Sequence, residues 1–130
     1  MISFNFFFPI ELHELEQKHF VEESVVVLGV HSAKFPNEKV SANILSAVLR
    51  YDIQHPVVND GDAVLWNAMA VRCWPTFVIV SPAGVPLIYL VGETHKETLF
   101  KFVDVALKYY KGKGMCGFFF LCCFSFTDHI

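Results

Sequence analysis

The thiols are the residues of this 130-residue chain best suited to chemistry. Its four cysteines are Cys73, Cys116, Cys122 and Cys123. Thiol–disulfide exchange needs an attacking thiolate and a second thiol close enough to close a disulfide. No pair has C-x-x-C spacing, and the adjacent Cys122 and Cys123 are poor partners because the geometry of a disulfide opposes their pairing. Cys73 is therefore alone in the main part of the chain, and we expect no dithiol catalysis.

Cys73 has one candidate partner, His31. Cys73 lies two residues before Pro75, and His31 ends an apolar run that reads as a parallel strand. The carboxyl ends of parallel strands are where α/β proteins build their sites, so a Cys/His pair there would supply a nucleophile and its base. The alternative is a small buried thiol beside Trp74, with His31 hydrogen-bonded in a loop. We favour the alternative because free cysteine is commonly buried.

Trp74, Pro75 and Thr76 form the second feature of interest, a corner that leads into a strand. Proline lacks a backbone N–H and is excluded from the middle of a sheet, so Pro75 must precede the strand or begin it. An X-Pro bond is also the common site of a cis peptide, which usually marks a tight turn. We expect Trp74-Pro75 to be a cis-proline corner.

The elements that would position these residues alternate between strand and helix. Short apolar or β-branched runs predict strands over 25–30, 55–58, 76–80 and 86–91, and Pro82 and Gly84 predict a tight turn between the last two. That turn permits only an antiparallel hairpin, whereas the earlier strands are separated by helices and should be parallel. The sequence therefore predicts an α/β fold: a mixed sheet of about four core strands with a C-terminal antiparallel hairpin and helices on both faces.

Helical spacing predicts four helices around this sheet. The first covers 10–20, the second follows Asn37 as its N-cap, and a short third helix over 63–70 is capped by Asp62. The last begins at Thr94, where Thr94 and Glu97 have capping-box spacing, and Gly112 and Gly114 end it.

Composition and charge exclude several classes of function. The net charge is −3 with acidic and basic residues interspersed, so the sequence lacks the run of basic residues by which a protein binds the phosphates of a nucleic acid. The apolar run 117–124 is far shorter than the roughly 20 residues that span a bilayer. The first residues lack the basic start of a signal peptide, so we expect a cytoplasmic protein with reduced thiols. The histidines are scattered, and Asn59, Asp60 and Asp62 read as turn residues, so we expect no metal and no cofactor.

Several strings resemble one known family. They are Gly29–Lys39, Ala47–Asp52, His55–Asp60, Trp74–Thr76 and Ala106–Tyr110. The chain is similar over about residues 11–113 to the thioredoxin-like domain of the NHL repeat-containing protein 2 family and its plant chloroplast relatives. The resemblance implies a thioredoxin-like three-layer sandwich and an ancestry in thiol-redox homeostasis. It also implies that Trp74, Pro75 and Thr76 border a groove in which an extended protein or peptide partner pairs its backbone, although the corner could equally serve only to begin the strand.

The chain departs from that family where the chemistry would be. Members carry a Cys-Cys-x-x-Cys segment just before the first helix and a β-propeller after the domain, whereas residues 1–8 contain no cysteine. We therefore expect a divergent apolar segment over 1–9, a thioredoxin-like domain over 10–114 and a disordered or artefactual Cys/Phe-rich tail over 115–130. The expected function is that of a redox-inactive thioredoxin-like domain. The alternatives are a non-catalytic interaction module that uses the groove and a truncated fragment of a larger NHL-repeat protein.

Overall fold

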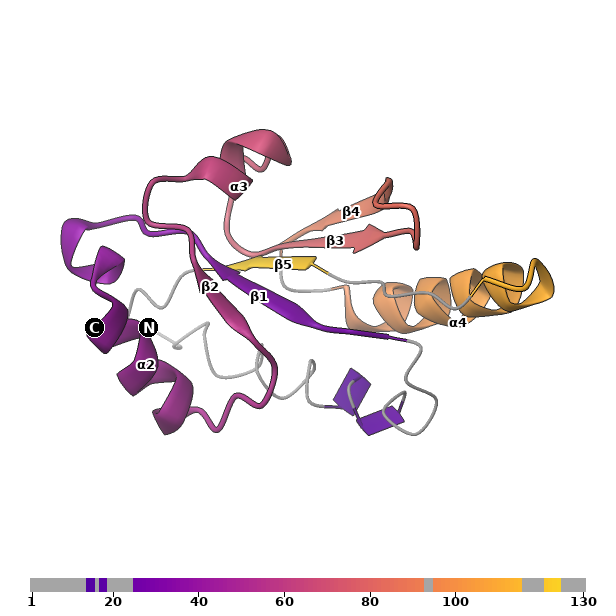
Figure 1. Cartoon of the computed structure of the whole chain (residues 1–130), viewed down its shortest axis with the longest axis horizontal. Helices are drawn as coiled ribbons and strands as arrows, with labels where there is room; N and C mark the ends of the chain where they lie inside the picture. Colours follow the sequence, from indigo (N-terminus) through magenta and orange to yellow (C-terminus); the bar gives the residue numbers. More distant parts are fainter. Residues whose placement is uncertain (1–13, 16, 19–24, 93–94, 116–120, 125–130) are drawn as a thin grey trace.

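The computed structural model describes residues 14–15, 17–18, 25–92, 95–115 and 121–124. Five strands form one sheet: β1 (Leu28–His31), β2 (Val57–Asn59), β3 (Thr76–Val80), β4 (Pro86–Val91) and β5 (Leu121–Phe124). Their order across the sheet is β2-β1-β5-β3-β4 (Figure 1). β1 is parallel to β2 and β5, whereas β3 is antiparallel to β4 and β5. The predicted mixed sheet with a C-terminal antiparallel hairpin is therefore present.

The helices lie on both faces of this sheet (Figure 1). They are the 3-10 turn η2 (Pro36–Lys39), α2 (Ser41–Arg50), α3 (Val64–Ala68) and α4 (Lys96–Gly112). The predicted first helix is helical at 14–15 and 17–18, the part of it that the structure describes. The expected apolar segment over 1–9 and the predicted cap at Thr94 lie outside the described residues.

Two apolar clusters show which elements cover which face. The larger cluster joins residues of α2, β3, β4 and α4, among them Ile44, Phe77, Leu90 and Leu99. The smaller cluster packs Val30 of β1 against Val71 and the partly buried side chains around α3. Successive residues of a strand face opposite sides, so one sheet can serve both clusters. The molecule is thus a three-layer α/β structure, with α2 and α4 on one face and α3 on the other.

Two helix starts differ from the sequence-based expectation. Asn37 lies within η2, and α2 begins only at Ser41, with Val40 as its N-cap and no capping side chain. The short helix α3 begins after Ala63, and its first backbone N–H groups are bonded by Asp60 rather than by Asp62. The predicted caps at Asn37 and Asp62 are wrong because spacing alone cannot show which polar side chain the tertiary fold turns towards the helix.

The strand β5 was not expected. It comes from the 115–130 segment, which the sequence suggested to be a disordered tail, and it lies between β1 and β3. For Leu121–Phe124 that expectation is wrong. A short uncharged run can enter a sheet where two strands offer unpaired backbone groups, and such groups are costly when left unbonded in an interior.

Candidate functional site: the Trp74–Thr76 corner

The candidate site lies at the edge of the sheet where β1 and β2 end and β3 begins. His31 and Asn59, the last residues of β1 and β2, stand opposite each other in the parallel register. Thr76, the first residue of β3, pairs with Cys123, which in turn pairs with Val30 near the end of β1. The sheet register therefore places the end of β1 and the start of β3 at one edge.

Trp74 is held at this edge by three contacts from two other segments. Its indole Nε1 donates a hydrogen bond of 2.7 Å to the backbone carbonyl of Ser32. Its ring lies 4.3 Å from that of Trp66, centroid to centroid, with a tilt of 31°. The Lys34 ammonium lies 4.7 Å from the Trp74 ring centroid, within the range of a cation–π contact. These contacts fix a half-buried aromatic ring at the surface of the site.

The peptide bond between Trp74 and Pro75 is cis, and β3 starts directly after it. The Thr76 hydroxyl is buried and donates a 2.7 Å hydrogen bond to the Cys73 carbonyl, which closes the corner. The Pro75 carbonyl accepts a 2.9 Å bond from the Gly92 N–H. Within the described residues, the backbone N–H groups of Cys73 and Trp74 have no protein acceptor. Among the described residues, nothing accepts a hydrogen bond from these two donors beside the Trp74 ring.

Asp60 connects the two segments that hold Trp74, namely the loop after β1 and the start of α3. It is 5% exposed, and its Oδ2 accepts bonds of 2.9 Å from the Ser32 hydroxyl and the Trp66 N–H. Its Oδ1 accepts a 2.9 Å bond from the Leu65 N–H, and its own N–H donates to the His31 carbonyl. Buried charge is tolerated only when hydrogen-bonded in this way. The sequence suggests only a turn or cap role for Asp60, because nothing in the sequence indicates that its side chain is buried.

His31 is fully buried, and its ring Nε2 donates a 3.0 Å hydrogen bond to the Glu38 carbonyl. Burial lowers the pKa of His31 below its ordinary value of 6.5, because desolvation opposes the charged ring more than Glu38 favours it. Glu38 is also buried, and its Oε2 accepts the Lys34 N–H at 2.6 Å. His31 and Glu38 therefore shape the loop that carries Lys34 to the site.

Cys73 is half-buried and its thiol is not in a disulfide. The hydrogen bond shown for the His31 ring goes to Glu38, on the loop after β1, and not to this thiol. The structure thus brings Trp74, Pro75, Thr76 and Cys73 together with Ser32 and Lys34. The pairing of Cys73 with His31 as nucleophile and base stays a prediction.

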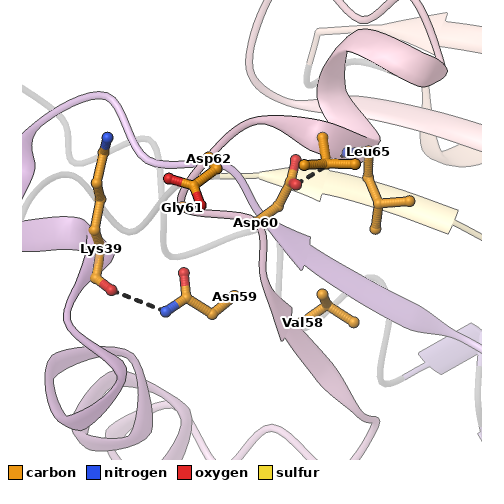
Figure 2. Close-up of a pocket in the computed structure, with 8 residues that line it drawn as sticks. Lys39, Val58, Asn59, Asp60, Gly61, Asp62 and Leu65 are labelled. Atoms are coloured by element: carbon orange, nitrogen blue, oxygen red, sulfur yellow. Dashed lines mark hydrogen bonds between the residues drawn. The ribbon is translucent and has the colours of Figure 1, made fainter.

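A cleft of about 400 Å³ opens beside this edge, at the end of β2 (Figure 2). Its lining residues are Lys39, Val58, Asn59, Asp60, Gly61, Asp62, Val64 and Leu65. The Asn59 amide donates a 2.8 Å bond to the Lys39 carbonyl, and Asp60 is turned towards α3 (Figure 2). The exposed charges of Lys39 and Asp62 are opposite in sign, so the cleft does not select a simple ion. In the described part of the chain, no three His, Cys, Asp or Glu side chains gather as metal ligands.

A family model described as thioredoxin-like matches residues 5–85, more than half of the chain. That span includes β1, β2, β3 and the whole of the corner from Cys73 to Thr76.

The chain is also similar to much longer proteins. It is 59% identical to NHL repeat-containing protein 2 of Gallus gallus over 104 residues, 80% of this chain and 14% of that protein. It is 56% identical to the Homo sapiens protein of the same name over an equal span. Protein SUPPRESSOR OF QUENCHING 1, chloroplastic, of Arabidopsis thaliana is 48% identical over 102 residues, 78% of this chain and 10% of that protein. The match thus spans about a seventh or less of these relatives. No described helix combines the length and apolar character that a membrane crossing requires.

Proposed function

Because the chain belongs to the thioredoxin-like family, we propose that it is a thioredoxin-like module of thiol-redox homeostasis that binds an extended polypeptide at Trp74, Pro75 and Thr76. The observation that carries the proposal is the pair of backbone donors at Cys73 and Trp74, which have no acceptor within the described residues. An extended segment would accept these hydrogen bonds through its own carbonyls, as in strand addition.

The surroundings of these donors suit a polypeptide ligand. The Trp74 ring offers apolar contact area at low conformational cost, because Trp66 and the Ser32 carbonyl already hold it in place. Aromatic residues of this kind are enriched among the side chains that dominate binding energy. Lys34 adds a positive charge beside the ring and would favour a ligand with a nearby acidic group.

The module is proposed to bind without catalysing dithiol exchange. The sequence has no Cys-x-x-Cys, and Cys73 is the cysteine placed next to the corner. A single thiol can attack a disulfide but has no neighbour to resolve the mixed disulfide that forms. In an insulin-reduction assay with dithiothreitol, we expect the rate of the dithiothreitol background. A rate clearly above it would contradict the non-catalytic part of the proposal. We propose the cytoplasm as its location, where such a thiol stays reduced.

Binding can be tested with random dodecapeptides displayed on phage and selected on the whole chain. The selected peptides should lose at least about tenfold in affinity for Trp74→Ala and keep their affinity for Tyr109→Ala, an exposed aromatic on α4. Replacing single peptide bonds of a selected peptide by ester bonds, which weakens the carbonyl as an acceptor, should weaken binding only at alternate residues, because one edge of an extended chain points to the corner. Equal binding to the wild type and Trp74→Ala, both folded by circular dichroism, would refute the docking site.

A further inference from the structure

The strand β5 holds the sheet together at its centre. Its register with β1 pairs Leu121 with Leu28 and Phe124 with His31, and its other edge pairs Leu121 with Val78. β1 and β3 are not neighbours in the sheet and are joined only through this strand. Both edges of β5 are therefore used, which is the position of a central strand.

Without β5, the sheet would consist of two separate ladders, β2-β1 and β3-β4. Their facing edges lie two inter-strand spacings apart, roughly 10 Å, so they cannot pair with each other as they stand. Each edge carries backbone N–H and C=O groups that need partners. The space between β1 and β3 thus accepts one extended strand, parallel to β1 and antiparallel to β3.

β5 is the last of the described elements along the chain. It follows all the strands with which it pairs, and eight residues (113–120) separate it from the end of α4. Those eight residues can span up to roughly 28 Å. Its sequence, Leu-Cys-Cys-Phe, has no charge and no proline, as an interior strand requires.

We propose that the space between β1 and β3 is a strand-binding site, and that its partner in trans is β5 of a second copy of this chain. The register that seats β5 in its own sheet is available in identical form to the β5 of another copy. Exchange of one identical element between two copies is a low-cost route to a dimer. The site meets the corner at Thr76, which pairs with Cys123, but it is formed by backbone groups of β1 and β3 and does not depend on the function proposed above.

The test uses the full chain with Cys122→Pro, which removes one β5 N–H and is incompatible with a central strand. The probe is a fluorescein-labelled peptide of residues 115–130, with serine at its cysteines to prevent disulfide exchange. We expect the peptide to bind the Cys122→Pro chain at least about tenfold more tightly than the wild type, whose own β5 competes for the site. Thr127→Pro, placed outside β5, should behave like the wild type.

Two further results decide the proposal. A probe peptide that itself carries proline at position 122 should not bind, and wild-type chains should form a concentration-dependent dimer that Cys122→Pro abolishes. If Cys122→Pro is unfolded, refolding by the probe peptide supports the site, and failure to refold overturns it. Absence of probe binding to a folded Cys122→Pro chain, or equal binding of the proline-bearing probe, would also overturn it. Trp74→Ala should leave probe binding unchanged, which separates this site from the corner.

Discussion

At the scale of single residues, the corner depends on polar side chains that bond backbone groups from other segments. Asp60 is the clearest case, since its carboxylate joins Ser32 after β1 to the first turn of α3. Ser32 in turn accepts the Trp74 indole through its carbonyl. A substitution at Asp60 should therefore affect the position of Trp74 indirectly, through Ser32.

Asp60→Ala should lower the free energy of unfolding by about 2–4 kcal/mol, because two backbone donors and one hydroxyl would lose a charged acceptor in a buried place. Urea unfolding followed by tryptophan fluorescence would measure this. The control is Asp62→Ala, an exposed residue of the same turn, which should change stability by less than about 0.5 kcal/mol. Equal effects of the two substitutions would show that Asp60 does not organise the site.

His31 should make stability depend on pH. Its pKa is lowered by burial, so as the pH falls below 6.5 the unfolded chain takes up a proton that the folded chain resists. The free energy of unfolding should then decrease with falling pH, by up to about 1.4 kcal/mol per pH unit, and should level off below the lowered pKa. Above pH 6.5 both states are neutral and the contribution vanishes. Urea titrations of His31→Gln, which keeps a donor for the Glu38 carbonyl, should show a shallower slope; identical slopes would rule out this origin.

Residue types alone identified the corner but not the network behind it. The position of Pro75 before a strand follows from its missing N–H, and Thr76 begins that strand as predicted. The role of Asp60 could not be predicted, because Asp60 and Asp62 are equally good cap residues in sequence. Only the tertiary fold buries one carboxylate and leaves the other exposed.

At the scale of elements, the β3–β4 hairpin was predictable over its full length. The turn is closed by a bond of 2.9 Å from the Gly84 N–H to the Ser81 carbonyl, and the Ser81 N–H donates to the Val85 carbonyl at 2.8 Å. Gly84 has a φ of +82°, in the region that favours glycine. The local chemistry of this turn is sufficient to fix it, which is why a sequence pattern could find it.

The same substitution at two glycines should have opposite effects. Gly84→Ala should destabilise the protein by about 1–2 kcal/mol, because alanine is strained at a positive φ. Gly112→Ala should stabilise it by up to about 1 kcal/mol, since Gly112 ends α4 with helical geometry and open space around it. Thermal unfolding of both variants measures the contrast. Destabilisation by both substitutions would contradict the assignment of strain to the backbone at Gly84.

Helix boundaries were less predictable than the hairpin. The apolar stripe of α4 was recognised from its spacing, and its residues Leu99, Val103 and Leu107 are buried as that spacing requires. The sequence predicts the start of α2 too early, because the residues of the preceding 3-10 turn η2 fit the helical pattern although they do not belong to the helix. There Glu38 bonds the Lys34 N–H, a contact that depends on the fold and not on helical periodicity.

At the scale of the whole molecule, the larger apolar cluster joins both halves of the chain. Ile44 of α2 and Leu99 of α4 belong to it together with Phe77 of β3. A shared core of this kind predicts that the described elements unfold together, including the Trp66 and Trp74 pair on the opposite face.

Leu99→Ala should therefore cost about 2–5 kcal/mol and shift the unfolding midpoints by the same amount whether tryptophan fluorescence or far-ultraviolet circular dichroism is used. Leu99 is 1% exposed, whereas Val105 on the same helix is 65% exposed. Val105→Ala should change stability by less than about 0.5 kcal/mol and serves as the control. Separate midpoints for the two probes would mean that the corner and the main core unfold independently.

The sequence indicated the α/β class and the helices on both faces, but not the central strand. β5 escaped prediction because Leu121–Phe124 is an apolar run without alternation that follows the last predicted helix. Its partners, Leu28 and Val78, are far away in sequence. No local sequence pattern indicates pairing between strands that are so far apart in the chain.

The late position of β5 has a consequence for synthesis on the ribosome. β4 ends at Val91 and β5 begins at Leu121, thirty residues later, which takes roughly 2–6 s at ordinary rates of translation. During that interval β1 and β3 have been made, but their shared partner has not. Until β5 is made, the nascent chain therefore carries two open strand edges, and such edges favour pairing with other chains.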